Sequence, residues 1–308
     1  YKFLTAFMII PPKLKVGDKI SIISTARKIS LQEMIPAITI LESWGLEVIL
    51  TKNIFKENNQ FAGTIEQRSA ALQDIIDNED IKAILCARGG YGSVQIIDNI
   101  DFSSLQKSPK WIVGFSDVTV LHSHLNNLGF ATLHAAMPIN FATNTDKSME
   151  SLKNVLFGDK KHIECKIHPF NKYGKVEAEI VGGNLSILYS LLGSPSDINT
   201  DRKILLIEDL DEYLYHIDRM IMNLKRNGKL DNLKGMIVGG MSDMNDNDIP
   251  FGETAEEIIL KHTKDYDFPV CFGFPVGHLN DNRAIKFGVK SKLEITAKKV
   301  ILSSNIHP

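Results

Sequence analysis

Cysteine is scarce in this sequence, and neither sign of charge is in excess. Cys86, Cys165 and Cys271 lie far apart and form no Cys-x-x-Cys pair. Such sparse cysteines argue against a disulfide framework and for a reducing compartment, so we expect a cytoplasmic protein. The 35 Lys and Arg residues nearly balance the 37 Asp and Glu residues, for a formal net charge of -2. Because no basic face is indicated, we expect no nucleic-acid partner.

Long apolar runs are also missing. The opening stretch YKFLTAFMII is apolar, but Pro11-Pro12 interrupts it and it falls below the ~18 residues of a membrane span. We therefore expect no membrane association, and we interpret residues 1–7 as a non-native or upstream extension before Met8. The alternative is the remnant of a signal segment or an anchor. The 308 residues, 44% of them apolar and 23% charged, are typical of a globular protein with room for two domains.

Strands and helices alternate along the first half of the chain. Short apolar runs predict strands, and apolar residues at helical spacing predict helices between them. The expected strands are 19–24, 46–51, 82–87 and 111–114, and the expected helices are 30–44, 65–77 and 117–127. Nearly continuous apolar strands in this alternation predict an α/β fold, with a parallel sheet covered on both faces.

The second half has a mixed pattern after a polar connection. We expect an N-terminal domain over 14–145, a connecting segment over 146–175 with one short helix near 148–156, and a C-terminal domain over 176–305. In that domain the pattern predicts helices at 184–192, 212–227 and 252–263, and strands near 203–207, 235–239, 269–272 and 292–301.

Two loops follow predicted strands of the first half, where ligands bind in an open α/β sheet. The loop 88–93 (RGGYGS) contains glycines that let backbone N–H groups approach a ligand; a phosphate cradle and a plain structural turn both fit. In the second loop, Ser116 and Asp117 stand at a strand-to-helix turn. A serine there presents its hydroxyl above the sheet, with the Asp117 N–H pointing to a developing oxyanion. The alternative is that Ser116 or Asp117 caps the helix.

A nucleophilic serine needs a base, and the base needs an orienting acid. His278 lies in a loop rich in glycine and polar residues, whereas His122 and His124 fall inside a predicted helix and face different sides. Glu208 ends a buried strand, where an ionised carboxylate needs a partner; the alternative is a charge at a helix entry beside Asp209. Cys86, at another strand end, is interpreted as core packing. The acidic loop 243–248 lacks a complete calcium ligand set, so no metal site is expected.

Five segments in order carry a resemblance: ARGGYGS (87–93), GFSDVTVLH (114–122), GGNLSIL (182–188), LLIEDLDEYLYHIDRM (205–220) and FPVGHLNDN (274–282). They resemble the signature segments of LD-carboxypeptidases, serine peptidases that also include the microcin C self-immunity hydrolases. The resemblance spans roughly residues 14–290. Two segments depart from the usual pattern, His134-Ala135-Ala136-Met137 and Lys286-Phe287-Gly288.

The resemblance implies Ser116 as nucleophile, His278 as base and Glu208 as the acid that orients His278. It implies an oxyanion hole made by the N–H groups of Asp117 and Gly90, or its neighbour Gly89. It also implies that Asn184 lines the substrate cleft, and we place Gly89 and Tyr91 there as further substrate contacts. The implied fold is a flavodoxin-like N-terminal domain and a smaller mixed α/β C-terminal domain, with the site at their interface.

The implied reaction is release of terminal D-Ala from a murein tetrapeptide through an acyl-enzyme, without cofactor or metal. The interval between Ser116 and Glu208 leaves no room for the longer insertion typical of the microcin hydrolases, which favours the peptidoglycan-recycling branch. A peptidyl- or aminoacyl-adenylate hydrolase is the alternative within the same chemistry. A non-catalytic nucleotide- or sugar-binding module is the alternative from another class. The resemblance also suggests a homodimer.

Overall fold

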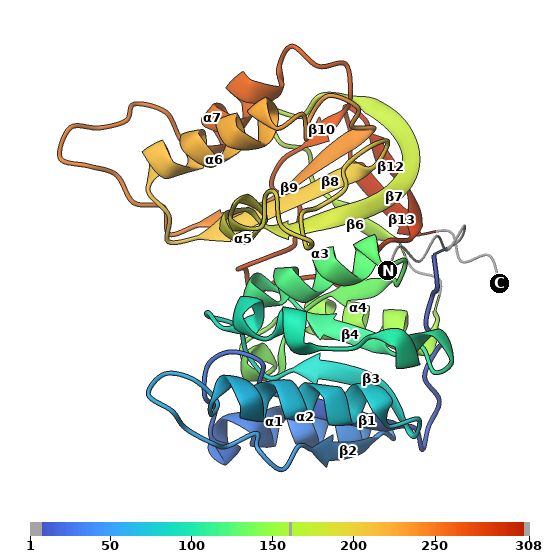
Figure 1. Cartoon of the computed structure of the whole chain (residues 1–308). Helices are drawn as coiled ribbons and strands as arrows, with labels where there is room; N and C mark the ends of the chain where they lie inside the picture. The colour runs from blue at the N-terminus through green and yellow to red at the C-terminus, as the bar shows by residue number, and fades with distance from the viewer. Residues whose placement is uncertain (1–7, 160–161, 305–308) are drawn as a thin grey trace.

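The computed structural model describes residues 8–159 and 162–304, arranged as two stacked sheets with helices against them (Figure 1). The N-terminal half forms the lower body in that view, and most of the C-terminal half forms the upper one. The interpretation of residues 1–7 as an extension concerns residues outside the described part of the chain. Within the described part, no helix combines the length and apolar character needed to cross a bilayer.

The first sheet has the strand order β2-β1-β3-β4-β5, and all of these neighbours are parallel. This is the flavodoxin-like doubly wound order, which confirms the predicted fold class. The strands are β1 (Lys19–Ile23), β2 (Glu47–Leu50), β3 (Ile81–Cys86), β4 (Trp111–Gly114) and β5 (Thr132–His134). The helices of this half are α1 (Leu31–Ser43), α2 (Ile65–Asp77), α3 (Thr119–Asn127) and α4 (Asp146–Phe157).

The second sheet contains both parallel and antiparallel pairs and, with its helices, forms the predicted α/β C-terminal half. Its order is β10-β9-β8-β7-β12-β13-β6, parallel from β10 to β7 and antiparallel from β7 to β6. Its strands are β6 (Ile163–Cys165), β7 (Gly174–Asn184), β8 (Ile204–Leu210), β9 (Gly235–Ser242), β10 (Val270–Cys271), β12 (Lys290–Ile295) and β13 (Val300–Ser304). Its helices are α5 (Leu185–Ser190), α6 (Leu214–Arg226) and α7 (Ala255–Thr263).

One strand crosses between the two halves. β11 (Ile285–Phe287) comes late in the chain but pairs antiparallel with β5, as the sixth strand of the first sheet. The loop before it is fastened to the start of α4: Ser148 Oγ donates to Asn282 O at 2.6 Å, and Ala284 N donates to Ser151 Oγ at 2.9 Å. The segment that carries His278 therefore starts in the second sheet and ends in the first.

Several predicted elements differ from those observed. The single strand expected over 292–301 is a hairpin of β12 and β13, which turns where Thr296 N donates to Lys299 O. β7 is a long strand that ends at Asn184, so the helix expected from 184 begins one residue later. Strand β7 itself was not predicted, and its first residues fall in the segment expected to be a connection. Strands β5, β6 and β11 were not predicted either. Each has three residues, which is too short to show a two-residue alternation.

Helix starts follow their sequences closely. α1, α2 and α7 each begin with a capping box, in which a Ser or Thr at the N-cap accepts from the third residue and that residue's Glu or Gln side chain accepts from the cap. The residue pairs are Ser30 with Glu33, Thr64 with Gln67, and Thr254 with Glu257. Apolar clusters on both faces of each sheet bury the strands and fix the edges at which the candidate site forms.

Candidate active site

A buried carboxylate–histidine pair lies at the carboxyl edge of the second sheet. Glu208, on β8, is fully buried, and its Oε2 accepts from His278 Nδ1 at 2.6 Å and from the His278 backbone N at 3.2 Å. The His278 side chain is about one-sixth exposed. The expectation that the Glu208 carboxylate has a partner is confirmed, and the alternative of a helix-entry charge is wrong, because Glu208 lies inside β8 and α6 begins only at Leu214.

Glycines make room for this pair. Gly277 has a φ of +98°, and a Cβ there would lie 2.5 Å from Glu208 Oε2. On the other side, β9 has an extra residue opposite Glu208, at Gly239-Gly240, where a Cβ on Gly239 would lie 2.5 Å from Val276 O. Bulges next to active sites commonly redirect a side chain. The chain before His278 therefore reaches Glu208 because both flanks lack side chains.

The pair has a definite electrostatic character. Burial lowers the pKa of His278, but the hydrogen bond and the charge of Glu208 outweigh burial, and the pKa is raised above its usual 6.5. Since Glu208 Oε2 accepts the Nδ1 proton, Nε2 is the nitrogen left to take up another proton. Next to it on β8, burial and the charge of Glu208 raise the pKa of Asp209 to about 7. An imidazole held in this way is suited to general-base chemistry.

Ser116 stands at a strained turn at the carboxyl edge of the first sheet. It follows β4, opens a 3-10 turn (Ser116–Val118) and has a φ of +62°, in the left-handed region that non-glycine residues seldom adopt. A Cβ on Gly89 would lie 3.0 Å from its Oγ, so the glycine-rich loop packs directly against the serine. Neither Ser116 nor Asp117 makes a side-chain cap at the start of α3, and the helix-cap alternative is wrong.

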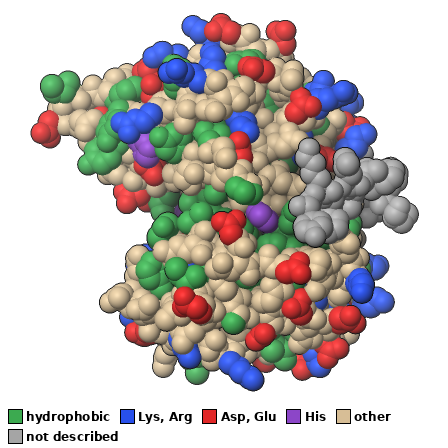
Figure 2. Space-filling model, in the orientation of Figure 1, with side chains coloured by type: hydrophobic (Ala, Val, Ile, Leu, Met, Phe, Trp, Pro, Cys, Tyr) green, Lys and Arg blue, Asp and Glu red, His purple; other side chains and the backbone are tan. Residues whose placement is uncertain are grey.

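The two edges meet beside Phe115. The ring of Phe115 packs edge-on against the ring of His278, with 4.8 Å between centroids. Because Ser116 is the next residue after Phe115, the turn that holds the serine adjoins the histidine from the other sheet. On the face shown in Figure 2, a waist separates the two halves, and apolar, acidic and histidine side chains gather along it. The structure thus brings the elements that carry Ser116, Glu208 and His278 together; their catalytic roles stay predictions.

The other predicted site residues lie around this meeting point. Gly90 has a φ of +108°, and the aliphatic stem of Arg27 covers the place that a Cβ would take. The Asp117 carboxylate is buried and accepts from Ser93 N at 2.9 Å. Tyr91 is half exposed, and its ring packs near that of Phe61. The roles of the Gly90 and Asp117 N–H groups as oxyanion donors and of Tyr91 as a substrate contact stay predictions.

Asn184, the predicted cleft residue, is almost completely buried. It is 5% exposed, and it caps α5 by accepting from Ile187 N at 3.2 Å while it donates to Asp209 Oδ1 at 2.8 Å. Its backbone N donates to Thr119 Oγ1, across the two sheets. These contacts show a role in holding α5 and α3 together; a contact with substrate stays a prediction.

Further buried polar residues near the site were not predicted. Arg68 on α2 is 2% exposed and bonds to two loops at the carboxyl edge of the first sheet. The sequence held one signal for this residue: Arg68 lies four and seven residues before Leu72 and Ile75, so it falls on the apolar face of the predicted helix. Asp209, with its pKa of about 7, had only a doubled acidic residue at a strand end as its signal.

Three residues with reactive side chains are accounted for by packing. Burial raises the pKa of Cys86 to about 12, so this thiol is a core residue, as predicted. Burial lowers the pKa of His122 to about 4, and the ring bonds to Gly114 O at 2.9 Å. His134, in the segment that departs from the family pattern, is also fully buried, and burial holds its pKa well below 6.5. Both histidines are therefore neutral at physiological pH.

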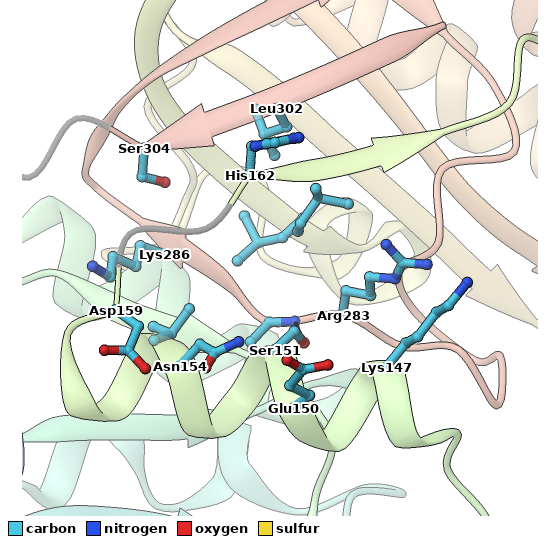
Figure 3. Close-up of a pocket in the computed structure, with 14 residues that line it drawn as sticks. Lys147, Glu150, Ser151, Asn154, Asp159, His162, Arg283, Lys286, Leu302 and Ser304 are labelled. Carbon is cyan, nitrogen blue, oxygen red and sulfur yellow. Dashed lines mark hydrogen bonds between the residues drawn. The ribbon is translucent and has the colours of Figure 1, made fainter.

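A cavity of about 260 Å³ lies elsewhere, between α4, β11 and β13 (Figure 3). Lys147, Glu150, Arg283 and Lys286 are among its lining residues, and none of the predicted site residues is. Arg283 is already paired with Asp281, at 2.9 Å between Nη2 and Oδ2. This cavity is therefore not the space in front of the Glu208–His278 pair.

The comparisons with known proteins identify the family. Residues 20–135 match the N-terminal domain of LD-carboxypeptidases, and residues 177–293 match the C-terminal domain. The chain belongs to the LD-carboxypeptidase family, a family of peptidases, which confirms the resemblance inferred from the five segments.

Named relatives and solved structures agree with this membership. A probable murein peptide carboxypeptidase of Bacillus subtilis is 31% identical over 96% of this chain and 95% of its own. The microcin C7 self-immunity protein of Escherichia coli is 25% identical over 94% of each chain. The crystal structure of a muramoyltetrapeptide carboxypeptidase from Oxalobacter formigenes has a TM-score of 0.85 and 27% identity, and covers 94% of this chain and 100% of its own.

Proposed function

We propose that this protein is a serine carboxypeptidase that hydrolyses the L,D amide bond of murein tetrapeptides and releases terminal D-Ala. The observation that carries the proposal is the buried Glu208–His278 pair beside the strained Ser116 turn. Family membership and the murein substrate named for the Bacillus subtilis relative support it. The proposed reaction is a step in peptidoglycan recycling.

In the proposed mechanism, His278 Nε2 removes the proton from Ser116 Oγ as the oxygen attacks the scissile carbonyl carbon. The carbonyl π electrons move onto oxygen, and the N–H groups of Gly90 and Asp117 stabilise the oxyanion. Glu208 holds Nδ1 and stabilises the imidazolium that forms. Collapse of the intermediate breaks the C–N bond, and His278 protonates the amine of D-Ala as it leaves. Water, deprotonated by His278, then attacks the acyl carbon. The bond from that carbon to Ser116 Oγ breaks, His278 returns the proton to Oγ, and the tripeptide is released. No step requires a metal or an organic cofactor.

Product analysis with a defined tetrapeptide tests the proposal. Incubation of L-Ala-D-Glu-(diamino acid)-D-Ala with the protein should yield free D-Ala and the tripeptide, resolved by mass spectrometry. A fluorophosphonate should label the protein once, on the peptide that contains Ser116. Absence of both D-Ala and label would reject the proposal, and a label on another serine would reject Ser116 as the nucleophile.

A second candidate is hydrolysis of a peptidyl- or aminoacyl-adenylate. The relative that favours it is the microcin C7 self-immunity protein, whose similarity extends over nearly all of both chains. It would use the same three residues. Parallel assays with the tetrapeptide and with an aminoacyl-sulfamoyl adenosine decide between the two by their ratio of kcat/KM. A non-catalytic nucleotide- or sugar-binding module would instead bind nucleotide at the loop 88–93 and take no fluorophosphonate label.

We also propose that the chain acts in the cytoplasm as a homodimer. Sparse cysteines support a reducing compartment, and light scattering of the purified protein tests the dimer.

We also propose the division of the chain into an N-terminal domain (14–145), a connecting segment (146–175) and a C-terminal domain (176–305). Limited proteolysis should cut first in the part of 146–175 that follows α4, if that segment connects two domains.

A further inference from the structure

Arg68 is an unusual occupant of its position. It lies on α2 and is 2% exposed, although a guanidinium is strongly disfavoured inside a protein unless its donors are used. Nη1 donates to Thr25 O at 2.8 Å and to Gly92 O at 2.9 Å, and Nη2 donates to Gln95 Oε1 at 2.6 Å. The guanidinium also lies over the ring of Phe61, 5.0 Å from its centroid. One buried cation thus joins the loop after β1 to the loop after β3.

The glycine-rich loop after β3 is shaped around this guanidinium. Gly92 has a φ of +150°, and a Cβ there would lie 2.7 Å from Arg68 Nη1. The next residue, Ser93, shares a hydrogen bond of 2.9 Å with Thr25 through their hydroxyl groups. Gly90, the proposed oxyanion donor, stands two residues before Gly92. The carbonyl that Arg68 holds thus lies two residues after the Gly90 N–H.

The same loop is fastened to the nucleophile turn through Asp117. Its Oδ2 accepts from Ser93 N at 2.9 Å, so one short bond joins the two segments that supply the two proposed donors. Burial raises the pKa of this carboxyl, while hydrogen bonds from Ser93 and Gly92 and the nearby charge of Arg68 oppose that rise. Arg68 thus stabilises the ionised carboxylate that holds Ser93, in addition to holding Gly92 directly.

We propose that Arg68 is a positioning residue of the oxyanion hole: it fixes the glycine-rich loop against the Ser116 turn and thereby sets the Gly90 N–H relative to the Asp117 N–H. The inference rests on the proposed function. Arg68 touches neither the reacting atoms nor the nucleophile, and it acts through main-chain carbonyls and through Asp117. Its effect should fall on the transition state, where the oxyanion forms, and not on binding of the ground state.

The chain offers a matched control at the opposite edge of the same sheet. Lys110 is also 2% exposed, and its Nζ donates to Asn78 O at 2.7 Å and to Ile81 O at 3.2 Å. It is a buried cation that holds main-chain carbonyls, but at the amino ends of β3 and β4. Replacing Lys110 removes a comparable structural contact far from the proposed donors.

The experiment compares Arg68→Met and Lys110→Met with the unaltered protein in D-Ala release from the tetrapeptide. Loss of one oxyanion donor lowers kcat by about 10²–10³, so a displaced donor in R68M should lower kcat by about 10–100-fold, with KM within about threefold. K110M should keep kcat within about threefold of the unaltered protein. Its melting temperature should fall by about as much as that of R68M. Arg68→Lys keeps the charge but not the three-way donor geometry, and it should lose kcat to an intermediate extent.

The outcomes separate the two proposals. If the unaltered protein releases no D-Ala, the proposed function fails, and Arg68 is not at issue. If the unaltered protein is active, three results with a folded R68M would show that the positioning role is wrong. They are an unchanged kcat, a change in KM alone, and a loss of kcat no larger than that in K110M. Should R68M fail to fold by circular dichroism, R68K decides the question: kcat equal to that of the unaltered protein would overturn the role.

Discussion

The carboxyl edges of the two sheets present their candidate catalytic groups in different ways. At the first sheet, the backbone does the positioning: Ser116 sits at a φ of +62° with Gly89 packed against its hydroxyl. At the second sheet, a charged group does the positioning: the buried Glu208 carboxylate holds the His278 imidazole, with 2.6 Å between Oε2 and Nδ1. The serine edge therefore depends on shape and the histidine edge on electrostatics, and substitutions at the two should fail differently.

The largest effect is expected at the serine edge, where one atom is removed. Ser116→Ala should lower kcat for D-Ala release by at least about 10⁴-fold, because no other group can form the acyl-enzyme. Its melting temperature should stay close to that of the unaltered protein, since Ala keeps the same backbone. Single-turnover assays and thermal unfolding measure the two quantities. Residual activity above one-tenth would remove Ser116 from the mechanism.

At the histidine edge, Glu208→Gln should lower kcat by about 10²–10⁴-fold, because the imidazole loses the charge that stabilises its protonated form. The matched control is Glu212→Gln. Glu212 Oε2 lies 2.7 Å from His216 Nδ1 in a pair one turn apart on the chain, where both side chains are about one-quarter exposed. E212Q should keep kcat within about twofold. Equal losses in the two variants would refute the special role of the buried pair.

A smaller effect tests whether shape also matters at the histidine edge. Gly277→Ala combines a strained φ of +98° with a Cβ 2.5 Å from Glu208 Oε2, whereas Gly252→Ala has a similar φ of +89° and open space around it. G252A should cost about 1 kcal/mol of folding stability from strain alone. G277A should cost about 2–4 kcal/mol and lower kcat by about tenfold. Urea unfolding and D-Ala release check both, and indistinguishable variants would mean that the carboxylate tolerates the methyl group.

The smallest expected effect is a shift along the pH axis. The base must be neutral at Nε2, so kcat/KM should rise as pH rises through the pKa of free His278. Since Glu208 raises that pKa above 6.5, the midpoint should lie above pH 6.5 in the unaltered protein and move to lower pH in E208Q. E212Q should not move it. A midpoint that stays in place in E208Q would show that another group controls the profile.

Much of this comparison could be predicted from the sequence, and the missing part has a physical reason. Apolar runs and helical spacing predicted the alternation of the first sheet. Residue types at strand ends made Ser116 and Glu208 candidates, a glycine-rich loop made His278 one, and the resemblance to LD-carboxypeptidases implied their roles. The pattern could not give β11, because three residues carry no period and its partner β5 lies more than 150 positions earlier in the chain. Arg68 was missed for a related reason: local sequence does not tell which carbonyls a buried guanidinium will meet.

The path of the chain after His278 has a mechanical consequence. The loop that carries this histidine is held by β10 in one sheet and by β11 in the other, and Asn282 near its β11 end is bonded to Ser148 of α4. A hinge motion that separated the two bodies would stretch this loop and draw the imidazole away from its neighbours. The distance between the two sheets and the position of the His278 imidazole are therefore coupled through one loop, so a change in the first would alter the second.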